Sequence, residues 1–127
     1  MVTDLSPELG GGGGAVSPGW MLRSGVAACA ATCIVMNAAL DGIELSELEV
    51  RADSRSDLRG LIGVPEADGA PVDPGPQAIV LNIKIAAPGV APERLRELVL
   101  KSHARAPMSA AVQQARDIDL AIQVVDA

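Results

Sequence analysis

The chain is short, acidic and rich in small aliphatic residues. It has 127 residues, of which 49% are hydrophobic and 20% charged, a formal net charge of −6, and no Phe or Tyr. This length and composition fit one folded domain with an aliphatic core and exclude a tandem multidomain architecture. The negative charge repels phosphate backbones and the lack of aromatic platforms disfavours base stacking, so we expect no nucleic-acid partner.

Cysteine usage and the N-terminus bear on the compartment. Cys29 and Cys33 are too few for a disulfide framework and match no zinc-ligand spacing, so we expect a reducing compartment and neither metal nor other cofactor. The first nine residues contain two acids and no Lys or Arg, unlike a signal peptide. The uncharged run 24–40 is shorter than the about 20 residues of a membrane span. We expect a cytoplasmic protein that is not membrane-bound.

A glycine-rich segment opens the chain. Residues 10–14 are all glycine, and Ala15 and Val16 follow them. A phosphate-binding P-loop would instead continue with Lys and then Ser or Thr at the start of a helix. We therefore interpret residues 1–16 as a flexible N-terminal segment of a single domain that spans residues 1–127.

A long helix is predicted next. Ser17 and Pro18 form a hydroxyl N-cap followed by proline at the first helical position, and Asp41-Gly42 marks a stop after Leu40. The middle of this helix is apolar or small on every face, and such a helix must be covered on all sides. A chain of this length can cover one side with its own sheet, so we expect the other side to be a subunit interface.

Three later stretches alternate between apolar and polar residues with period two, which predicts half-buried strands over 47–53, 78–85 and 117–124. The connection 57–76 is rich in Gly and Pro, and we expect a loop pinned by Leu61, Ile62 and Val64. Two further helices are predicted, one from Pro92 and a shorter one from Pro107 to about residue 115.

The candidate reactive side chains are Cys29, Cys33 and His103. His103 lies among charged residues of an amphipathic helix and outside any nucleophile-elbow motif, which favours a partly exposed surface histidine over a general base. The two cysteines share a helix face, where thiols are commonly inert core groups. Their i,i+4 spacing separates the Cβ atoms by about 5 to 6 Å, too far for a disulfide.

Two motifs resemble the OsmC/Ohr family of organic hydroperoxide reductases. The helix start at Pro18 with Cys29 eleven residues later is similar to the family's central helix, and Ala106-Pro107-Met108-Ser109 stands where the family has Cys-Pro-Val-Ser. The resemblance covers about residues 8–125. It implies an α+β fold with a long central helix on antiparallel sheet, an intertwined homodimer with shortened N-terminal strands, and Cys29 as the peroxidatic thiol.

The chain departs from the family at three catalytic positions. Ala106 replaces the resolving cysteine, Gly19 replaces a glutamate, and residues 1–22 contain no basic residue to supply the activating arginine. An unactivated thiol is only about 3% thiolate at pH 7. Two functions remain: a weak single-cysteine thiol peroxidase that uses an external thiol reductant on a small hydrophobic peroxide, or a non-catalytic dimer that binds a small hydrophobic ligand in an interface pocket.

Overall fold

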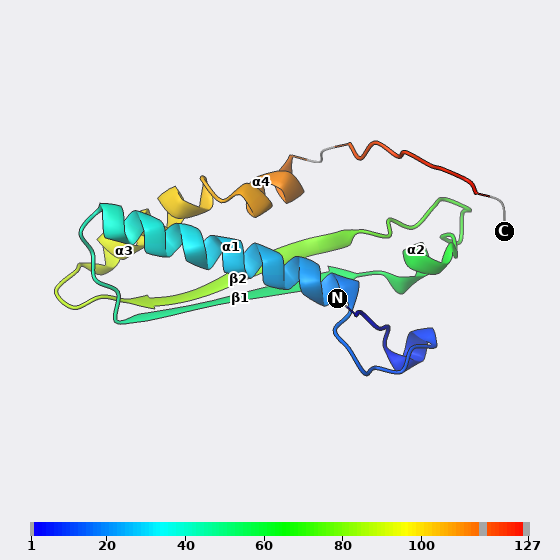
Figure 1. Cartoon of the computed structure of the whole chain (residues 1–127), viewed down its shortest axis with the longest axis horizontal. Helices are drawn as coiled ribbons and strands as arrows, with labels where there is room; N and C mark the ends of the chain where they lie inside the picture. The colour runs from blue at the N-terminus through cyan, green and yellow to red at the C-terminus, as the bar shows by residue number, and fades with distance from the viewer. Residues whose placement is uncertain (1, 115–116, 126–127) are drawn as a thin grey trace.

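The computed structural model of the chain describes residues 2–114 and 117–125 and has an α+β architecture (Figure 1). One long helix lies along a narrow antiparallel sheet, and two shorter helices pack beside it, which agrees with the α+β arrangement expected from the sequence. The elements in chain order are the 3-10 turn η1 (Pro7–Leu9), α1 (Pro18–Leu40), β1 (Glu47–Ser56), α2 (Leu58–Ile62), β2 (Pro76–Ala86), α3 (Pro92–His103) and α4 (Pro107–Gln113).

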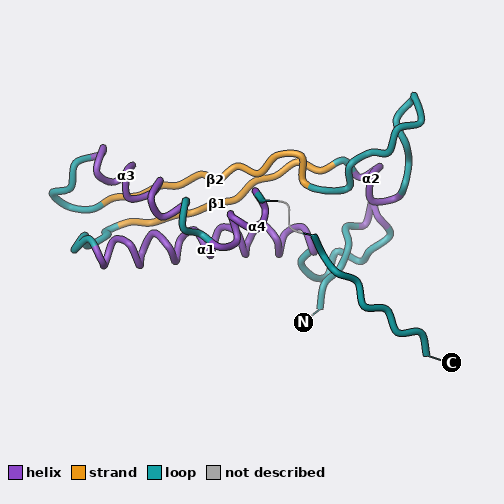
Figure 2. Tube along the Cα trace, turned by 90° about the horizontal axis from the view of Figure 1, so that it is seen from above, coloured by secondary structure: helices purple, strands orange, loops and turns teal. Residues whose placement is uncertain are grey.

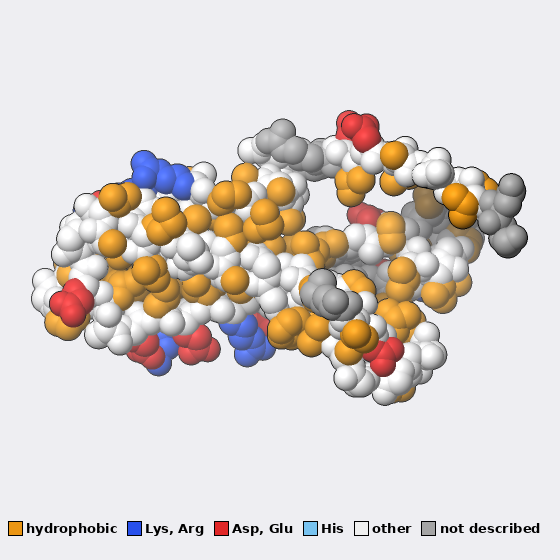
Figure 3. Space-filling view, in the orientation of Figure 1, with side chains coloured by type: hydrophobic (Ala, Val, Ile, Leu, Met, Phe, Trp, Pro, Cys, Tyr) orange, Lys and Arg blue, Asp and Glu red, His pale blue; other side chains and the backbone are white. Residues whose placement is uncertain are grey.

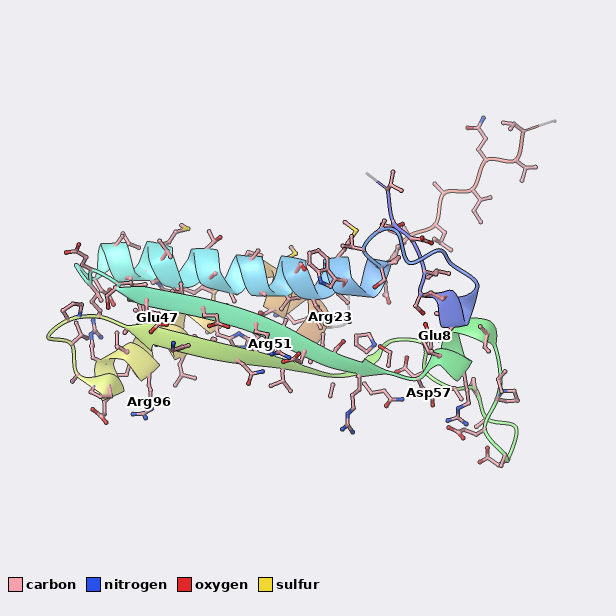
Figure 4. The ribbon with its side chains drawn as sticks, turned by 90° about the horizontal axis from the view of Figure 1, so that it is seen from below. Glu8, Arg23, Glu47, Arg51, Asp57 and Arg96 are labelled. Carbon is pink, nitrogen blue, oxygen red and sulfur yellow. The ribbon has the colours of Figure 1, made fainter. Side chains whose placement is uncertain are left out.

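The sheet of the described chain has the order β1-β2, with the two strands antiparallel. Its register places Val50 opposite Ile83 on the apolar face. The opposite face is polar, with Arg51 opposite Asn82, and the charged side chains of β1 project away from α1 (Figure 4). Both strands match the predicted period-two stretches, because alternation gives each strand one face for the core and one for water.

α1 begins and ends where its local signals place it. The Ser17 side chain accepts a hydrogen bond of 3.1 Å from the Trp20 backbone N–H, and Gly42 adopts a left-handed φ of 67° after the helix. One face packs on the sheet through a buried series at helical spacing, which consists of Val26, Ala30, Ile34 and Ala38. The views from two directions show this helix beside the strands along its whole length (Figures 1 and 2).

The opposite face of α1 is apolar and exposed. Hydrophobic side chains spread over the face of α1 that Figure 3 turns toward the viewer. Met36 is 59% exposed and Leu40 is 79% exposed. By length and composition alone α1 is long and apolar enough to cross a membrane, and within the described chain one of its faces packs on the sheet. The described chain therefore covers one side of α1 and leaves the other side exposed, and the expected subunit interface stays a prediction.

α3 completes the core and is tied to the end of α1 by charge. Leu95 and Leu98 are buried against Ile34 and Ala38 in one cluster. Asp41, just after α1, accepts hydrogen bonds from Lys101 at 2.7 Å and Arg94 at 3.0 Å. The hydrogen bond from Lys101 is the largest cause that lowers the pKa of the Asp41 carboxyl.

The prediction of a strand over 117–124 is wrong for the single chain. Residues 117–125 run away from the body as an extended tail without strand pairing (Figures 1 and 2). Its apolar side chains are exposed, with Ile118 at 85% and Val124 at 90%. The alternation is present, but a strand also requires a neighbouring strand to satisfy its backbone groups.

The connection between β1 and β2 also differs from the prediction. It contains the short helix α2, which Asp57 caps by accepting a hydrogen bond of 3.0 Å from the Arg59 backbone N–H. Leu61, Ile62 and Val64 were expected to anchor this connection in the core, but all three side chains are exposed. Instead Arg59 bridges Asp57 and Glu66 through its guanidinium, an ion pair across the connection.

The glycine run folds around an internal carboxylate. Asp4 accepts backbone hydrogen bonds from Gly12 at 3.2 Å and Gly14 at 2.9 Å, and the bond from Gly14 is the largest cause that lowers the Asp4 pKa. A Cβ on Gly11 would lie 2.0 Å from the carbonyl oxygen of Leu5, so this position requires glycine. These backbone donors are used by the chain's own anion, in line with the rejection of a phosphate-binding loop.

We predict that the chain forms a dimer through the exposed face of α1. Ala28→Arg places a charge on that face, where an unpaired buried charge in the dimer would cost several kcal/mol. Light scattering should show a dimer for the unaltered chain and a monomer for Ala28→Arg. Ala28 is exposed in the single chain, so the variant should still fold, and Ala67→Arg in the exposed connection is the matched control. A stable monomer of the unaltered chain at micromolar concentration contradicts this prediction.

Candidate functional site

The two thiols lie midway along α1, one turn apart. Cys29 and Cys33 are both free and half-buried, on the border between the face that packs on the chain and the exposed face. Burial is the main cause that raises the pKa of the Cys33 thiol above its ordinary value, and the neighbouring Cys29 thiol adds to the shift. Burial therefore makes Cys33 a poorer thiolate source than an ordinary free thiol, and Cys29 stays the candidate nucleophile from the family resemblance.

The arginines that could activate Cys29 are engaged elsewhere. Arg23 projects from α1 toward β1 and donates a hydrogen bond of 3.2 Å to the Ser54 hydroxyl (Figure 4). Arg105 donates a hydrogen bond of 2.9 Å to the Asn37 side-chain oxygen. A cation lowers a thiol pKa only when it stands close to the sulfur. Neither guanidinium is therefore directed at Cys29 in the single chain.

Asn37 is a site-forming residue that the sequence analysis did not single out. Its amide nitrogen donates a hydrogen bond of 2.8 Å to the Cys33 backbone oxygen, while its oxygen accepts from Arg105. The residue is buried on the same face as Ile34 and Ala38. The signal was available, because an Asn inside an apolar helix face needs a polar partner. Asn37 thus fixes Arg105 beside the Cys33 turn of α1.

Gly19 and Cys29 stand far apart in one chain. Ten residues along a helix correspond to about 15 Å, so a carboxylate at position 19 could not reach the thiol of its own chain. A Cβ on Gly19 would lie 3.6 Å from a guanidinium nitrogen of Arg23, which leaves room for a side chain. The glycine therefore leaves Arg23 without the carboxylate neighbour that a glutamate would give it.

Ala106 stands at the N-cap of α4, which packs on α1, and it is completely buried. A methyl group at this position supplies no sulfur, so no disulfide can form here. Ser109 follows one turn later, and its buried hydroxyl has no hydrogen-bond partner among the described residues. His103 is half-buried at the end of α3, with its Nε2 atom 3.3 Å from Nε2 of Gln113.

We predict that alkylation of Cys33 needs a higher pH than alkylation of an ordinary free cysteine. Because burial raises its pKa, the thiolate fraction at pH 8 should be lower than in the unfolded chain. Peptide-resolved mass spectrometry of iodoacetamide labelling against pH measures this shift. The denatured chain is the control, and coincident pH profiles in the folded and denatured states contradict the prediction.

We also predict that mild oxidation does not join Cys29 to Cys33 within one chain. The intact helix holds their Cβ atoms about 5 to 6 Å apart, and a disulfide needs about 3.5 to 4.5 Å. Mass spectrometry of nonreduced peptides from folded protein is the measurement. A 29–33 bridge within one chain would show that α1 unwinds locally and would refute the prediction.

Comparison with known proteins identifies similar sequences and folds. The model of the OsmC-like protein family matches residues 10–121. The structure resembles an organic hydroperoxide resistance protein OsmC from Legionella pneumophila, with 23% identity, a TM-score of 0.60, and coverage of 89% of this chain and 73% of that one. An OsmC-like protein from Mycoplasma pneumoniae has 21% identity and a TM-score of 0.64, with coverage of 80% and 64%.

A third similar structure comes from Vibrio cholerae O1. It is described as a putative organic hydroperoxide resistance protein with captopril bound in one of its active sites. It shares 26% identity with this chain at a TM-score of 0.60, and the match covers 91% of this chain and 70% of that one. No curated protein matches the chain. Each of these three solved structures is longer than this chain, which covers between 64% and 73% of their length.

Proposed function

The chain belongs to the OsmC-like protein family, and on this basis we propose that it acts in organic hydroperoxide detoxification as a slow, single-cysteine thiol peroxidase. Family membership supports the general role in oxidative stress. The observation that supports the specific chemistry is the half-exposed, free Cys29 at the family's peroxidatic position in the middle of α1.

The proposed reaction uses one sulfur of the chain in three steps. The Cys29 thiolate attacks the outer oxygen of an organic hydroperoxide, the O–O bond breaks, and the products are a sulfenic acid on Cys29 and an alcohol that takes up the thiol proton. An external thiol then attacks the sulfenic sulfur, releases water and forms a mixed disulfide. A second external thiol restores the free Cys29 and leaves as the oxidised disulfide.

Four features support a low rate. Ala106 supplies no resolving sulfur, Gly19 supplies no carboxylate, and both Arg23 and Arg105 bond to groups other than the thiol. Position 29 is also about three turns into α1, beyond the reach of the N-terminal helix dipole. The same losses support the second candidate, a non-catalytic dimer that binds a small hydrophobic ligand at the subunit interface.

We predict that cumene hydroperoxide adds one oxygen and then a second to Cys29. Because Ala106 supplies no sulfur and the helix keeps Cys33 too far from Cys29 for a disulfide, oxidation continues to sulfinic acid unless an external thiol is present. Intact-mass spectrometry during a titration with cumene hydroperoxide measures the added oxygens. An external dithiol should reduce the sulfenic acid as it forms and so prevent the gain of the second oxygen. Cys33→Ser should behave like the unaltered chain, whereas Cys29→Ser should gain no oxygen.

Two outcomes would overturn the peroxidase proposal. No mass change, together with a Cys29 that resists alkylation until the protein unfolds, would favour the ligand-binding dimer. Peroxide turnover that survives Cys29→Ser would contradict the assignment of the reaction to this residue.

A further inference from the structure

Three sulfur-containing side chains share one side of α1. Cys29, Cys33 and Met36 occupy positions i, i+4 and i+7 of this helix. Because an α-helix has about 3.6 residues per turn, this spacing places all three on the same face within about two turns. Both cysteines are free and half-buried, and Met36 is exposed. These three residues, the sulfur face of α1, therefore present three accessible sulfur donors from a single chain.

The two thiols of the sulfur face are close enough to share one ion. Burial first, and then the charge of the Cys29 thiol and a hydrogen bond with it, raise the pKa of Cys33. Their Cβ atoms lie about 5 to 6 Å apart on a helix, too far for a direct bond between the sulfurs. A zinc–thiolate bond is about 2.3 Å long, so two sulfurs on one metal ion can lie up to about 4.6 Å apart. The spacing that prevents a disulfide therefore admits an ion between the thiols.

Met36 can add a third donor to the same ion. Side chains on a helix lean toward its N-terminus, so a residue at position 36 covers the turn that contains Cys33. Methionine is unbranched and carries a polarisable thioether at the end of a flexible stem. Met36 is exposed, so packing within the described chain does not hold its side chain in place. Its sulfur can therefore turn toward the two thiols.

The donor set selects the kind of ion. Thiolate and thioether ligands favour copper(I), zinc and iron–sulfur clusters, and the last two are held by four ligands. Among the described residues, no group of three or more His, Cys, Asp and Glu side chains could hold a metal ion. The expectation of no metal came from zinc-ligand spacing, and it does not cover an ion that accepts two or three sulfur ligands. Copper(I) is such an ion, with a filled d shell and a preference for low coordination numbers.

We propose that Cys29, Cys33 and Met36 bind one copper(I) ion. The ion replaces the two thiol protons, which pass to the solvent, and no electron is transferred. This site does not depend on the peroxidase proposal, because the peroxide reaction uses the Cys29 sulfur alone whereas the copper site needs both cysteines. All three donors come from one chain, so the expected stoichiometry is one ion per chain.

Competition with the copper(I) chelator bathocuproine disulfonate, without oxygen, measures the affinity and the stoichiometry. Cys29→Ser and Cys33→Ser should each weaken copper(I) binding at least about a hundredfold, because each removes one of the two thiolates. Cys33→Ser combined with Val35→Cys is the matched control for the number of thiols. It moves the second thiol about a third of a turn around the helix from Cys29 and should bind as weakly as Cys33→Ser alone. Val35 is exposed, so this variant should still fold.

The thioether has its own variant and control. Met36→Leu keeps an apolar side chain of similar volume and should weaken copper(I) binding about tenfold. Met108→Leu, at an exposed methionine of α4, should leave the affinity within about twofold.

A further measurement needs no variant. One equivalent of copper(I) should slow iodoacetamide labelling of Cys29 and Cys33 together in the unaltered chain, because each sulfur would be bound to the ion. Peptide-resolved mass spectrometry follows the two cysteines separately.

Four results would overturn the inference. Binding by Cys33→Ser with Val35→Cys as tight as in the unaltered chain would show that spacing does not matter. One ion per two chains would assign the ligands to different copies. Protection of one cysteine alone would remove the shared ion, and unchanged affinity in Met36→Leu would remove the third donor.

Discussion

The structure depends on the burial of a helix that has almost no polar face. α1 covers one side through Val26, Ala30 and Ile34, which pack on the sheet of β1 and β2. A two-stranded sheet with one long helix has too little surface to cover the rest, so the outer side of α1, the edge of β2 and the tail all present apolar side chains to water. Hydrophobic burial scales with the area removed from water. A second copy that covers these surfaces would therefore stabilise the fold.

Local signals made part of the fold predictable from the sequence. The Ser17 cap, the prolines that open α1, α3 and α4, and the alternation in β1 and β2 each act within a few residues, and the structure confirms them. Residues 117–125 show the limit of such signals. Their alternation predicts a strand, but a local pattern contains no information about which neighbouring strand would pair with it. α2 was missed although Asp57 caps it through a local hydrogen bond, because the helix has only 5 residues and its exposed apolar side chains form no buried face.

The candidate site was partly predictable for the same reason. The sequence itself shows Cys29 and the residues at positions 19 and 106. It does not show the hydrogen bonds from Arg23 to Ser54 and from Arg105 to Asn37, because these join residues 31 and 68 positions apart. In the proposed site, Cys29 keeps the sulfur that the chemistry would use, while Ala106 and Gly19 supply neither a second sulfur nor a carboxylate and both arginines bond to other groups. Slow chemistry at Cys29 and ligand binding without chemistry are the two functions compatible with that arrangement.

The central claim is that this fold is stabilised by a second copy of the same chain. Binding that occurs in the folded state alone raises the unfolding midpoint with concentration. The most direct measurement is therefore the thermal unfolding midpoint over a hundredfold range of protein concentration. The account predicts a midpoint that rises steadily with concentration and ceases to do so for Ala28→Arg. A midpoint independent of concentration, with reversible unfolding of a monomer, would contradict it.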